Sequence, residues 1–417
     1  MDKILIEGGT PLSGSVKISG AKNAALPLIF STILSRNVNL LENVPDLADI
    51  RTAVKLLQGI GCQVEHTGNS LEINSSTITS HEAPYDLVRT MRASCLMMGP
   101  LLARYGNAIV SLPGGCAIGA RPINLHLQAF EALGAKIELK HGYVHASAKK
   151  LHGAKIYFDT VTVTGTENAM MAAVLAKGET VIENAAMEPE IMNLAEALNE
   201  AGARIVGAGE SEMRIQGVDE IGGLNSRIIP DRVEAGTFMV AGLVTGGDIL
   251  IEDCTPGDLE IVILKLREMG ASIETGQNFI RVRGNGKIHP VKIVTHPHPG
   301  FPTDMQAQFM VAAALADGTS IINEMVFENR FMHVSELTRM GSDISVDGHA
   351  AVVVGTPKLS GASVMATDLR ASASLVLAGL VAEGETEVLR VYHLDRGYER
   401  MEDKLRKLGA NIRREKA

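Results

Sequence analysis

The sequence lacks tryptophan altogether, and aromatic residues make up only 4% of its 417 positions. Its core must therefore rest on Ala, Val, Leu, Ile and Met, whose smaller side chains allow close helix packing. The four cysteines have no CxxC spacing, which argues against a disulfide framework and against a zinc site. No run of about 18 apolar residues is present, so we expect no membrane-spanning helix.

An excess of basic residues is also missing, since the formal net charge is −9. Nucleic-acid partners are not expected, because binding to phosphate backbones needs a basic surface. The first residues, MDKILIEGG, show neither a long apolar run nor a cleavage site, so we expect no signal peptide and a cytoplasmic protein. With 46% hydrophobic and 21% charged residues, the chain has a globular composition. Its length predicts two domains, because single cores stop growing at roughly 250–300 residues.

A short phrase recurs along the whole chain at intervals of about 70 residues. It reads as an apolar helix, a Gly-Ala pair or a close variant, and a strand rich in Ile or Val. Six copies are present, at Gly61, Gly134, Gly202, Gly270, Gly341 and Gly409. A second phrase joins an alanine-rich helix to a strand through a glycine, as in AAVLAKGETVIEN, AGLVTGGDILIED, AAALADGTSIINE and LAGLVAEGETEVL. We expect this glycine to be left-handed at the helix end.

Each repeat thus predicts a strand, a helix, a strand, a helix and two short strands. The helices expected at Ala169–Lys177 and Val233–Thr245 are apolar on all sides, which is typical of buried helices. We therefore predict an α/β fold with helices inside and sheets outside, in two lobes of three repeats that meet near Ser226–Asp231. A single solenoid of six repeats is the alternative, but it would need polar capping repeats, which the sequence does not show.

Dense motifs along the chain resemble those of the MurA family, the UDP-N-acetylglucosamine 1-carboxyvinyltransferases. The resemblance rests on SGAKNAALP, TMRAS, LPGGCAIGARPINLH, ENAAMEPEI, PDRVEAGTF, FPTDMQAQF, VFENRFMHV, MATDLRASASLVLAG and YHLDRGYERMEDKL. It implies a two-lobed inside-out α/β barrel with six β/α repeats, three per lobe. Lobe I would be 22–229 with a cysteine loop at about 112–122, lobe II 1–21 plus 230–417, and the active site would lie in the cleft between them.

The implied reaction transfers the enolpyruvyl group of phosphoenolpyruvate to the 3-hydroxyl of UDP-N-acetylglucosamine and releases phosphate. It proceeds by addition and elimination through a tetrahedral intermediate, and it is the first committed step of peptidoglycan precursor synthesis. The two small molecules are the expected partners, with no nucleic acid and no membrane. No cofactor and no metal are expected, and His126, His296 and His298 lack a spaced carboxylate partner. The sequence does not predict the oligomeric state.

Phosphoenolpyruvate carries a phosphate and a carboxylate close together, so its site needs several cations. By resemblance, Lys22, Arg121 and Arg396 contact these groups, with Arg92, Arg330 and Arg370 as further binding residues. The alternative is that such residues are ordinary solvated charges. Arg121 follows a Gly-rich loop and Arg370 lies beside the apolar run ASASLVLAG, and cations in such places call for a partner.

Cys116 differs from Cys62, Cys95 and Cys254, which we expect to be buried and inert. It lies in a Gly-rich run near Arg121, a setting that favours a thiolate. The resemblance implies that it protonates the methylene carbon of phosphoenolpyruvate, that fosfomycin alkylates it, and that its loop closes over bound sugar nucleotide.

Asp304 and Asn23 complete the catalytic residues that the resemblance implies, together with Cys116, Lys22 and Arg396. A carboxylate at Asp304 would accept the proton of the sugar hydroxyl or only orient that hydroxyl. Asn23 would donate a hydrogen bond at the reacting centre. For both residues helix capping is the alternative, Asp304 before MQAQFMVAAAL and Asn23 before AALPLIF.

The nucleotide sugar is expected to contact two short segments and one later residue. These are Arg121, Pro122, Ile123, Asn124 and Leu125, then Val161, Thr162, Val163 and Thr164, and finally Val326. Two positions depart from the family pattern: Asn124 replaces a common aspartate, and Thr160 stands where some members carry lysine. The second change could weaken diphosphate binding.

Two alternative functions remain open. The sister enzyme, 5-enolpyruvylshikimate-3-phosphate synthase, shares the repeats and phosphoenolpyruvate but has no loop cysteine, so Cys116 argues against it. A catalytically silent nucleotide-sugar-binding paralogue would be expected to lose Cys116, Lys22 or Asp304, and all three are present.

Overall fold

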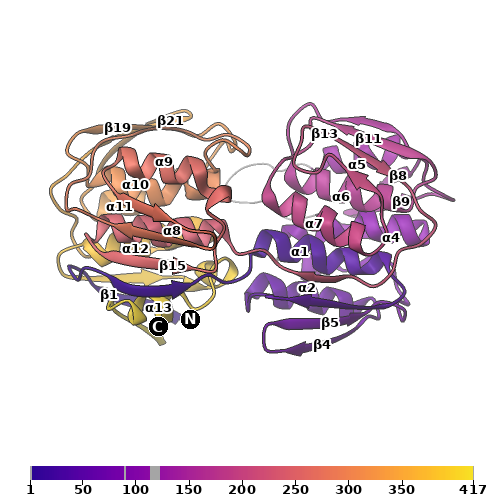
Figure 1. Cartoon of the computed structure of the whole chain (residues 1–417), viewed down its shortest axis with the longest axis horizontal. Coiled ribbons are helices and arrows are strands. Elements are labelled where there is room, and N and C mark those ends of the chain that lie inside the picture. Colours follow the sequence, from indigo (N-terminus) through magenta and orange to yellow (C-terminus); the bar gives the residue numbers. More distant parts are fainter. Residues whose placement is uncertain (1, 89–90, 113–122, 417) are drawn as a thin grey trace. The chain divides into compact units, whose positions relative to one another are not determined.

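The computed structural model describes residues 2–88, 91–112 and 123–416 of the chain. These residues form two compact units (Figure 1). Unit I lies within residues 20–229, and unit II combines residues 2–19 with 230–416. Of the helices within these ranges, none combines the length and the apolar character that crossing a bilayer would require.

Each of the six repeats follows the predicted order of strand, helix, strand, helix, strand and strand. The first strands are β2 (Ser13–Lys17), β6 (Glu82–Ala83), β10 (Lys155–Tyr157), β14 (Asn225–Arg227), β18 (Lys292–Val294) and β22 (Ser363–Met365). The first helices are α1 (Lys22–Ser31), α4 (Met98–Tyr105), α6 (Val163–Val174), α8 (Arg232–Val244), α10 (Gln306–Ala314) and α12 (Leu369–Val381). The second strands are β3 (Val38–Glu42), β7 (Asn107–Ser111), β11 (Glu179–Glu183), β15 (Asp248–Glu252), β19 (Thr319–Asn323) and β23 (Glu385–Leu389).

The second half of each repeat holds a second helix and the two closing strands. The second helices are α2 (Ala48–Gly59), α5 (Asn124–Ala132), α7 (Pro189–Glu200), α9 (Glu260–Glu268), α11 (Val334–Arg339) and α13 (Met401–Lys407). The closing strands are β4 (Gln63–Thr67), β5 (Ser70–Asn74), β8 (Lys136–Lys140), β9 (Tyr143–Ser147), β12 (Ile205–Val206), β13 (Glu212–Gln216), β16 (Ser272–Thr275), β17 (Phe279–Arg283), β20 (Asp343–Asp347), β21 (Ala350–Val354), β24 (Asn411–Lys416) and β1 (Asp2–Glu7). Additional short helices are α3 (Tyr85–Val88), η1 (Thr32–Leu34), η2 (Arg92–Met97), η3 (Pro256–Leu259), η4 (Thr303–Met305) and η5 (Val391–Arg396).

The described strands form six separate four-stranded sheets, one for each repeat. In every sheet one first strand of a repeat runs parallel to a second strand, and the remaining pairs are antiparallel. The first strands of the first and fourth repeats are exchanged: β2 pairs with β15 of the fourth repeat, within unit II, and β14 pairs with β3 of the first repeat, within unit I. The strand β1 lies between β23 and β24, so both ends of the chain belong to the same sheet.

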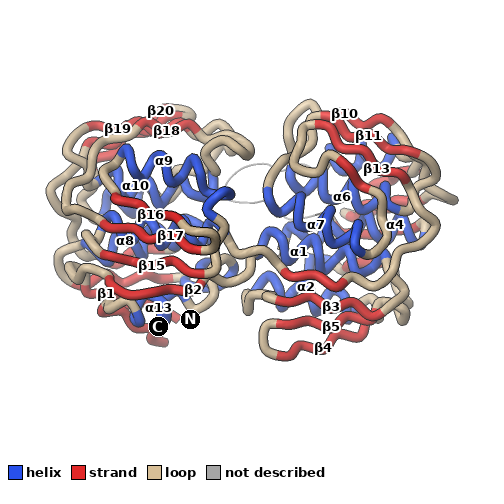
Figure 2. The backbone as a smooth tube through the Cα atoms, viewed as in Figure 1, coloured by secondary structure: helices blue, strands red, loops and turns tan. Residues whose placement is uncertain are grey.

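The first helices of the repeats lie inside each unit, and the strands lie outside them (Figure 2). Nearly every residue of α6 and α12 is buried, as expected for helices without a polar face. The inside-out arrangement is therefore confirmed. The predicted ends were less accurate, because α6 begins at Val163 and stops at Val174 rather than spanning Ala169–Lys177, and α8 is shifted by one residue from Val233–Thr245.

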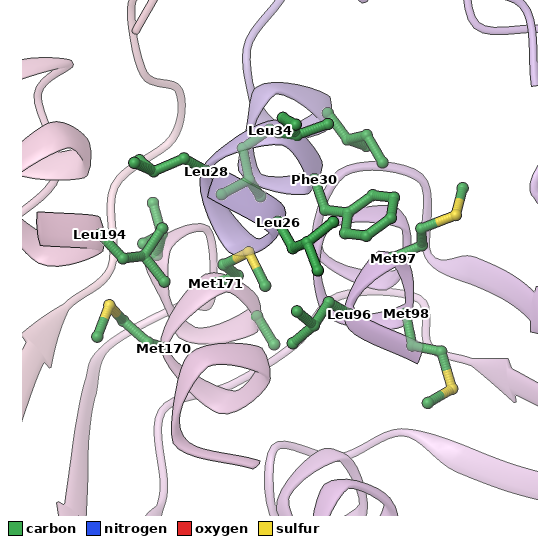
Figure 3. Close-up of a cluster of buried hydrophobic side chains, with 14 of the residues drawn as sticks. Leu26, Leu28, Phe30, Leu34, Leu96, Met97, Met98, Met170, Met171 and Leu194 are labelled. Carbon is green, nitrogen blue, oxygen red and sulfur yellow. The ribbon is translucent and has the colours of Figure 1, made fainter. Parts of the chain in front are cut away.

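Two hydrophobic cores hold the fold, one in each unit. In unit I, Leu26 and Phe30 of α1 face Leu96 of η2 and Met171 of α6 (Figure 3). The helices α4 and α6 approach closely at Gly99, where an added Cβ would lie 2.5 Å from the main-chain oxygen of Asn168. Small residues thus replace the missing aromatic rings by letting backbones pack directly.

The glycine of the six-fold phrase lies two residues beyond the second helix of every repeat. All six copies have φ between 93° and 109°, a left-handed conformation that stops a helix and that side chains with a Cβ rarely adopt. In the second phrase, the glycine between the alanine-rich helix and the strand was also expected to be left-handed, and this is confirmed at Gly178, Gly246 and Gly384. The expectation is wrong at Gly318, which does not have a positive φ and instead packs against Pro290.

Candidate active site

The predicted site residues follow the carboxyl ends of the parallel strand pairs. In open α/β sheets this edge is the usual place for ligands, because loops and helix N-termini meet there. Lys22 follows β2, Val161–Thr164 follow β10, Asp304 follows β18 and Arg370 follows β22. Val326 and Arg330 follow β19, and Arg396 follows β23. The repeat therefore places the predicted site residues after equivalent strands of different sheets.

Three of the predicted residues, Cys116, Arg121 and Pro122, lie outside the described residues. Among the others, Lys22 and Asn23 open α1, and Arg92 opens η2. Ile123 precedes α5, which begins with Asn124 and Leu125. Thr162 is the N-cap of α6, whose first residues are Val163 and Thr164.

Asp304 lies at the centre of a charged cluster in unit II. Its Oδ1 accepts a hydrogen bond from Nη2 of Arg330 at 2.7 Å, and its Oδ2 accepts one from Nε of Arg370 at 3.2 Å. The side chain of Asp304 remains 26% exposed, whereas those of Arg330 and Arg370 are 5% and 2% exposed. Two buried guanidinium groups thus hold one partly accessible carboxylate, and the sequence-predicted residues Asp304, Arg330 and Arg370 come together.

Arg370 is the largest fully buried side chain among the described residues. Its Nη2 lies 3.7 Å from Oδ2 of Asp231, and its Nη1 donates to the main-chain oxygen of Gly397 at 3.2 Å. Burial alone would lower the pKa of Arg370. Asp231, Tyr398 and Asp304 together raise that pKa by more than burial lowers it, so the net shift is upward. The guanidinium therefore stays charged.

The capping alternatives for Asn23 and Asp304 are both wrong. The N-cap of α1 is Ala21, and Asn23 is the second helical residue. Asp304 lies inside η4, whose N-cap is Pro302, and α10 is capped by Met305 without a side-chain hydrogen bond. Asp304 directs its carboxylate to arginines instead, so its role is not to cap a helix.

Lys22 is almost buried at the first turn of α1, with 7% of its surface exposed. Its Nζ lies 3.5 Å from Oδ2 of Asp49 in α2, which is itself 4% exposed. A lysine held at a buried helix N-terminus is unusual, because both the desolvation and the helix dipole disfavour a cation there. This location is suited to a site that receives an anionic ligand.

His126 joins the two segments that were predicted to bind the nucleotide sugar. Its Nδ1 accepts from Nδ2 of Asn168 at 3.0 Å, since the amide oxygen of Asn168 already accepts from the main-chain nitrogen of Gly99. Its Nε2 therefore carries the proton and donates to Oγ1 of Thr164 at 3.2 Å. Burial, and then Arg92, lower the pKa of His126 to about 4. A neutral imidazole thus ties the start of α5 to the start of α6.

The remaining cysteines behave as expected, because Cys62, Cys95 and Cys254 are buried and free. Burial raises the pKa of Cys95 to about 12 and that of the other two to about 11, which keeps the thiols protonated. Within 2–88, 91–112 and 123–416, no group of three or more His, Cys, Asp and Glu side chains is arranged to hold a metal ion.

Sequence reasoning missed the partners of the predicted residues. Asp231 and Asp49 pair with Arg370 and Lys22, and His126 was interpreted as an ordinary histidine. Glu324, which is fully buried directly after β19, was not singled out. The available signal was its position, because an acidic residue that follows a strand at the carboxyl edge of a parallel pair is well placed to contact a site.

The family model for EPSP synthase (3-phosphoshikimate 1-carboxyvinyltransferase) matches residues 6–405. The UDP-N-acetylglucosamine 1-carboxyvinyltransferase of Geobacter metallireducens is 58% identical over 416 residues, which covers 100% of both chains. The enzyme of the same name from Geotalea daltonii is 58% identical and covers 99% of both chains.

Solved structures agree with this relationship. The crystal structure of the enolpyruvyl transferase NikO from Streptomyces tendae is similar with a TM-score of 0.90 and 26% identity, covering 100% of this chain and 99% of that one. EPSP synthase from Acinetobacter baumannii is similar with a TM-score of 0.77 at 18% identity, covering 100% of both chains, and this likeness concerns the fold alone. The predicted two-domain α/β fold is thereby confirmed. The chain belongs to the EPSP synthase family of carboxyvinyltransferases and, within it, to the UDP-N-acetylglucosamine 1-carboxyvinyltransferases.

Proposed function

We propose that this protein transfers the enolpyruvyl group of phosphoenolpyruvate to the 3-hydroxyl of UDP-N-acetylglucosamine and releases phosphate. The observation that carries the proposal is 58% identity, over the full length of both chains, to relatives that are named for this activity. The reaction opens the synthesis of peptidoglycan precursors, and we place it in the cytoplasm. The family members named for shikimate 3-phosphate are a weaker alternative, because the solved example is only 18% identical.

The proposed chemistry needs an anion site for phosphoenolpyruvate, and the buried Lys22 supports one. Lys22, with Arg92, Arg121 and Arg396, would bind the phosphate and carboxylate. Lys22 and its partner Asp49 are both buried, so the ammonium group is held without freedom to move into solvent. Cations fixed before the substrate arrives stabilise developing charge without reorganisation. Asn23, half-buried on the next position of α1, would donate a hydrogen bond to the reacting centre.

Asp304 would receive the sugar hydroxyl. Each of its oxygens accepts one guanidinium hydrogen bond, and a carboxylate oxygen can accept a second. Fixing both oxygens orients the carboxylate group, which favours a role in aligning the 3-hydroxyl and in accepting its proton. Arg330 and Arg370 would hold this geometry through addition and elimination.

The nucleotide part would lie against the starts of α5 and α6. Ile123, Asn124 and Leu125 on one side and Val161–Thr164 on the other are tied together by the neutral His126. Main-chain N–H groups at helix N-termini are suited to diphosphate oxygens, which makes up for the lysine absent at Thr160. Val326 would contact the sugar.

Cys116 would supply the proton to the methylene carbon while the sugar oxygen attacks the adjacent carbon. The tetrahedral intermediate then loses phosphate, and the methyl group gives back a proton as the vinyl group reforms. The proposed catalytic groups thus include Lys22 and Asn23 of unit I and Asp304 and Arg396 of unit II, together with Cys116. No redox group takes part in this scheme.

The deciding experiment is phosphate release from phosphoenolpyruvate with UDP-N-acetylglucosamine or shikimate 3-phosphate as the acceptor. Release only with the sugar nucleotide is expected. Release only with shikimate 3-phosphate would assign the sister activity, and no release with either, despite binding of the nucleotide sugar, would indicate a silent paralogue. Intact mass after exposure to fosfomycin should show one adduct that maps to Cys116, and its absence would remove the thiol from the mechanism.

A further inference from the structure

Glu324 is a fully buried acidic residue that no step of the proposed chemistry uses. It follows β19, and Thr295 follows the parallel neighbour β18 in the same register, since Val294 pairs with Asn323. Both residues therefore lie at the carboxyl edge of the sheet that leads to Asp304. A buried carboxylate is costly unless its oxygens are well hydrogen-bonded, so its contacts need an account.

The two carboxylate oxygens of Glu324 have separate sets of donors. Oε1 accepts from the hydroxyl of Thr295 at 2.8 Å and from the main-chain nitrogens of Val326 and Phe327 at 2.9 and 3.1 Å. Oε2 accepts from the hydroxyl of Thr303 at 2.8 Å. One oxygen thus fixes the backbone at Val326, the proposed sugar contact, and the other fixes the residue next to Asp304.

The hydroxyl of Thr303 passes this constraint on to Asp304. A hydroxyl has one proton, and here that proton points to Glu324. One of its two lone pairs then faces Arg330, whose Nη1 donates to it at 2.8 Å while Nη2 of the same guanidinium donates to Asp304 at 2.7 Å. Every donor and acceptor in the path from Glu324 to Asp304 is therefore in one fixed orientation.

We propose that Glu324 is a positioning residue for the transfer reaction: through Thr303 and Arg330 it aligns Asp304, and through Val326 it aligns the sugar-binding backbone. This role rests on the proposed function. The competing account is that Glu324 only stabilises the loop after β19. Both accounts predict a loss of stability when a hydrogen-bond donor to Glu324 is removed. Only the alignment account predicts that kcat falls for one of these donors and not for the other.

The chain offers a matched pair for the test. Thr295 and Thr303 each donate to Glu324 at 2.8 Å, and each accepts one N–H, from Met325 at 2.9 Å and from Arg330 at 2.8 Å. Only Thr303 leads to Asp304. We expect Thr303→Val to lower kcat with UDP-N-acetylglucosamine by at least about 10-fold, and Thr295→Val to change it by less than about threefold, with similar decreases in Tm.

Two further variants and the unchanged protein complete the design. Thr303→Ser keeps the hydroxyl and should restore kcat to within about threefold of the original. Glu324→Gln places an amide N–H₂ against hydrogen-bond donors. It should lower kcat and raise the KM for the sugar nucleotide, each by about 10-fold. Equal kcat for the two valine variants, or no rescue by serine, would overturn the positioning role while the proposed function stands. An unmodified protein without turnover on the sugar nucleotide would overturn both.

Discussion

The surroundings of Asp304 in unit II and of His126 in unit I both provide partners for buried polar groups, but by different means. Around Asp304, buried guanidinium groups are paired with carboxylates, and Arg370 pairs with both Asp231 and Asp304. Around His126, a neutral imidazole, an amide and a hydroxyl exchange hydrogen bonds. The first arrangement depends on charge pairing, which is strong and intolerant of losing a partner. The second depends on neutral donors and acceptors, so it is sensitive to acid.

The largest effect is expected at the charged side of this comparison. Asp304→Ala should lower kcat roughly 10²–10⁴-fold, the range for losing a group that orients or accepts a proton in the transition state. Arg370 stays paired, because it retains Asp231. Steady-state phosphate release measures this effect, and circular dichroism checks folding. Asp317→Ala, an exposed aspartate of the same unit, is the control and should leave kcat unchanged.

Arg370→Met tests how strongly the charged cluster holds unit II together. It leaves Asp231 buried without this guanidinium, so the free energy of unfolding should fall by about 3–5 kcal/mol. Urea denaturation measures the change. The matched control is Arg281→Met, which breaks two hydrogen bonds to the half-buried Asp248 and should cost about 1 kcal/mol or less. Equal losses would mean that burial of the pair contributes nothing.

The neutral side of the comparison should respond to pH. The folded pKa of His126 is about 4, below its ordinary value of 6.5, so between these pH values the unfolded chain binds a proton that the folded chain does not. The stability linked to His126 is therefore fully present above pH 6.5 and falls by about 3 kcal/mol as the pH approaches 4. His126→Phe should flatten this fall, as followed by urea denaturation from pH 7 to pH 4.5.

His333 of unit II is a second buried histidine with which that titration can be compared. It is also buried, and burial lowers its pKa to about 4 in the same way, with Arg330 lowering it and Asp368 raising it. Its Nε2 has no hydrogen-bond partner in the described part of the chain, unlike both ring nitrogens of His126. His333→Phe should flatten the acid response as well, but with a smaller loss at pH 7 than His126→Phe, which gives up two hydrogen bonds.

The smallest effect separates binding from chemistry. Lys22→Met should raise the KM for phosphoenolpyruvate by about 10-fold, since a hydrogen bond to a charged group contributes roughly 1.5–3 kcal/mol. The KM for the sugar nucleotide should change by less than about twofold. Lys155→Met, an exposed lysine of unit I, is the control. A selective change in the sugar-nucleotide KM instead would assign Lys22 to the other substrate.

The sequence predicted the repeat architecture well because its signals are local. Gly61 and its five counterparts mark helix ends through backbone conformation alone, and helices without a polar face must be buried wherever they lie. Helix ends were predicted less well. The start of α6 was missed because Thr162 caps it through its own side chain, which extends the helix over the polar residues before Ala169.

The pairing of side chains was beyond sequence reasoning. Asp304 and Arg370 are far apart in the chain, and nothing at either position shows that Asp231 shares the same guanidinium. The capping alternatives were reasonable from local pattern, but tertiary contacts override local preference when a charge must be matched in the interior. The family resemblance named the residues, whereas Glu324 and Thr303 became visible only through the geometry around them.

The pairing of the first strands with segments made later sets an order for assembly during synthesis. The segment Asp2–Glu7 completes its sheet only with β23 and with β24, which ends at Lys416, and β2 must await β15. By contrast, the last strand of unit I, β14, ends at Arg227. At roughly 5–20 residues per second, β1 therefore stays unpaired on the ribosome for about 10–40 seconds after unit I is complete, whereas β2 waits only about 1–5 seconds. An amino terminus that waits in this way is an exposed edge, and it is the part of the nascent chain most open to chaperones and to misassembly.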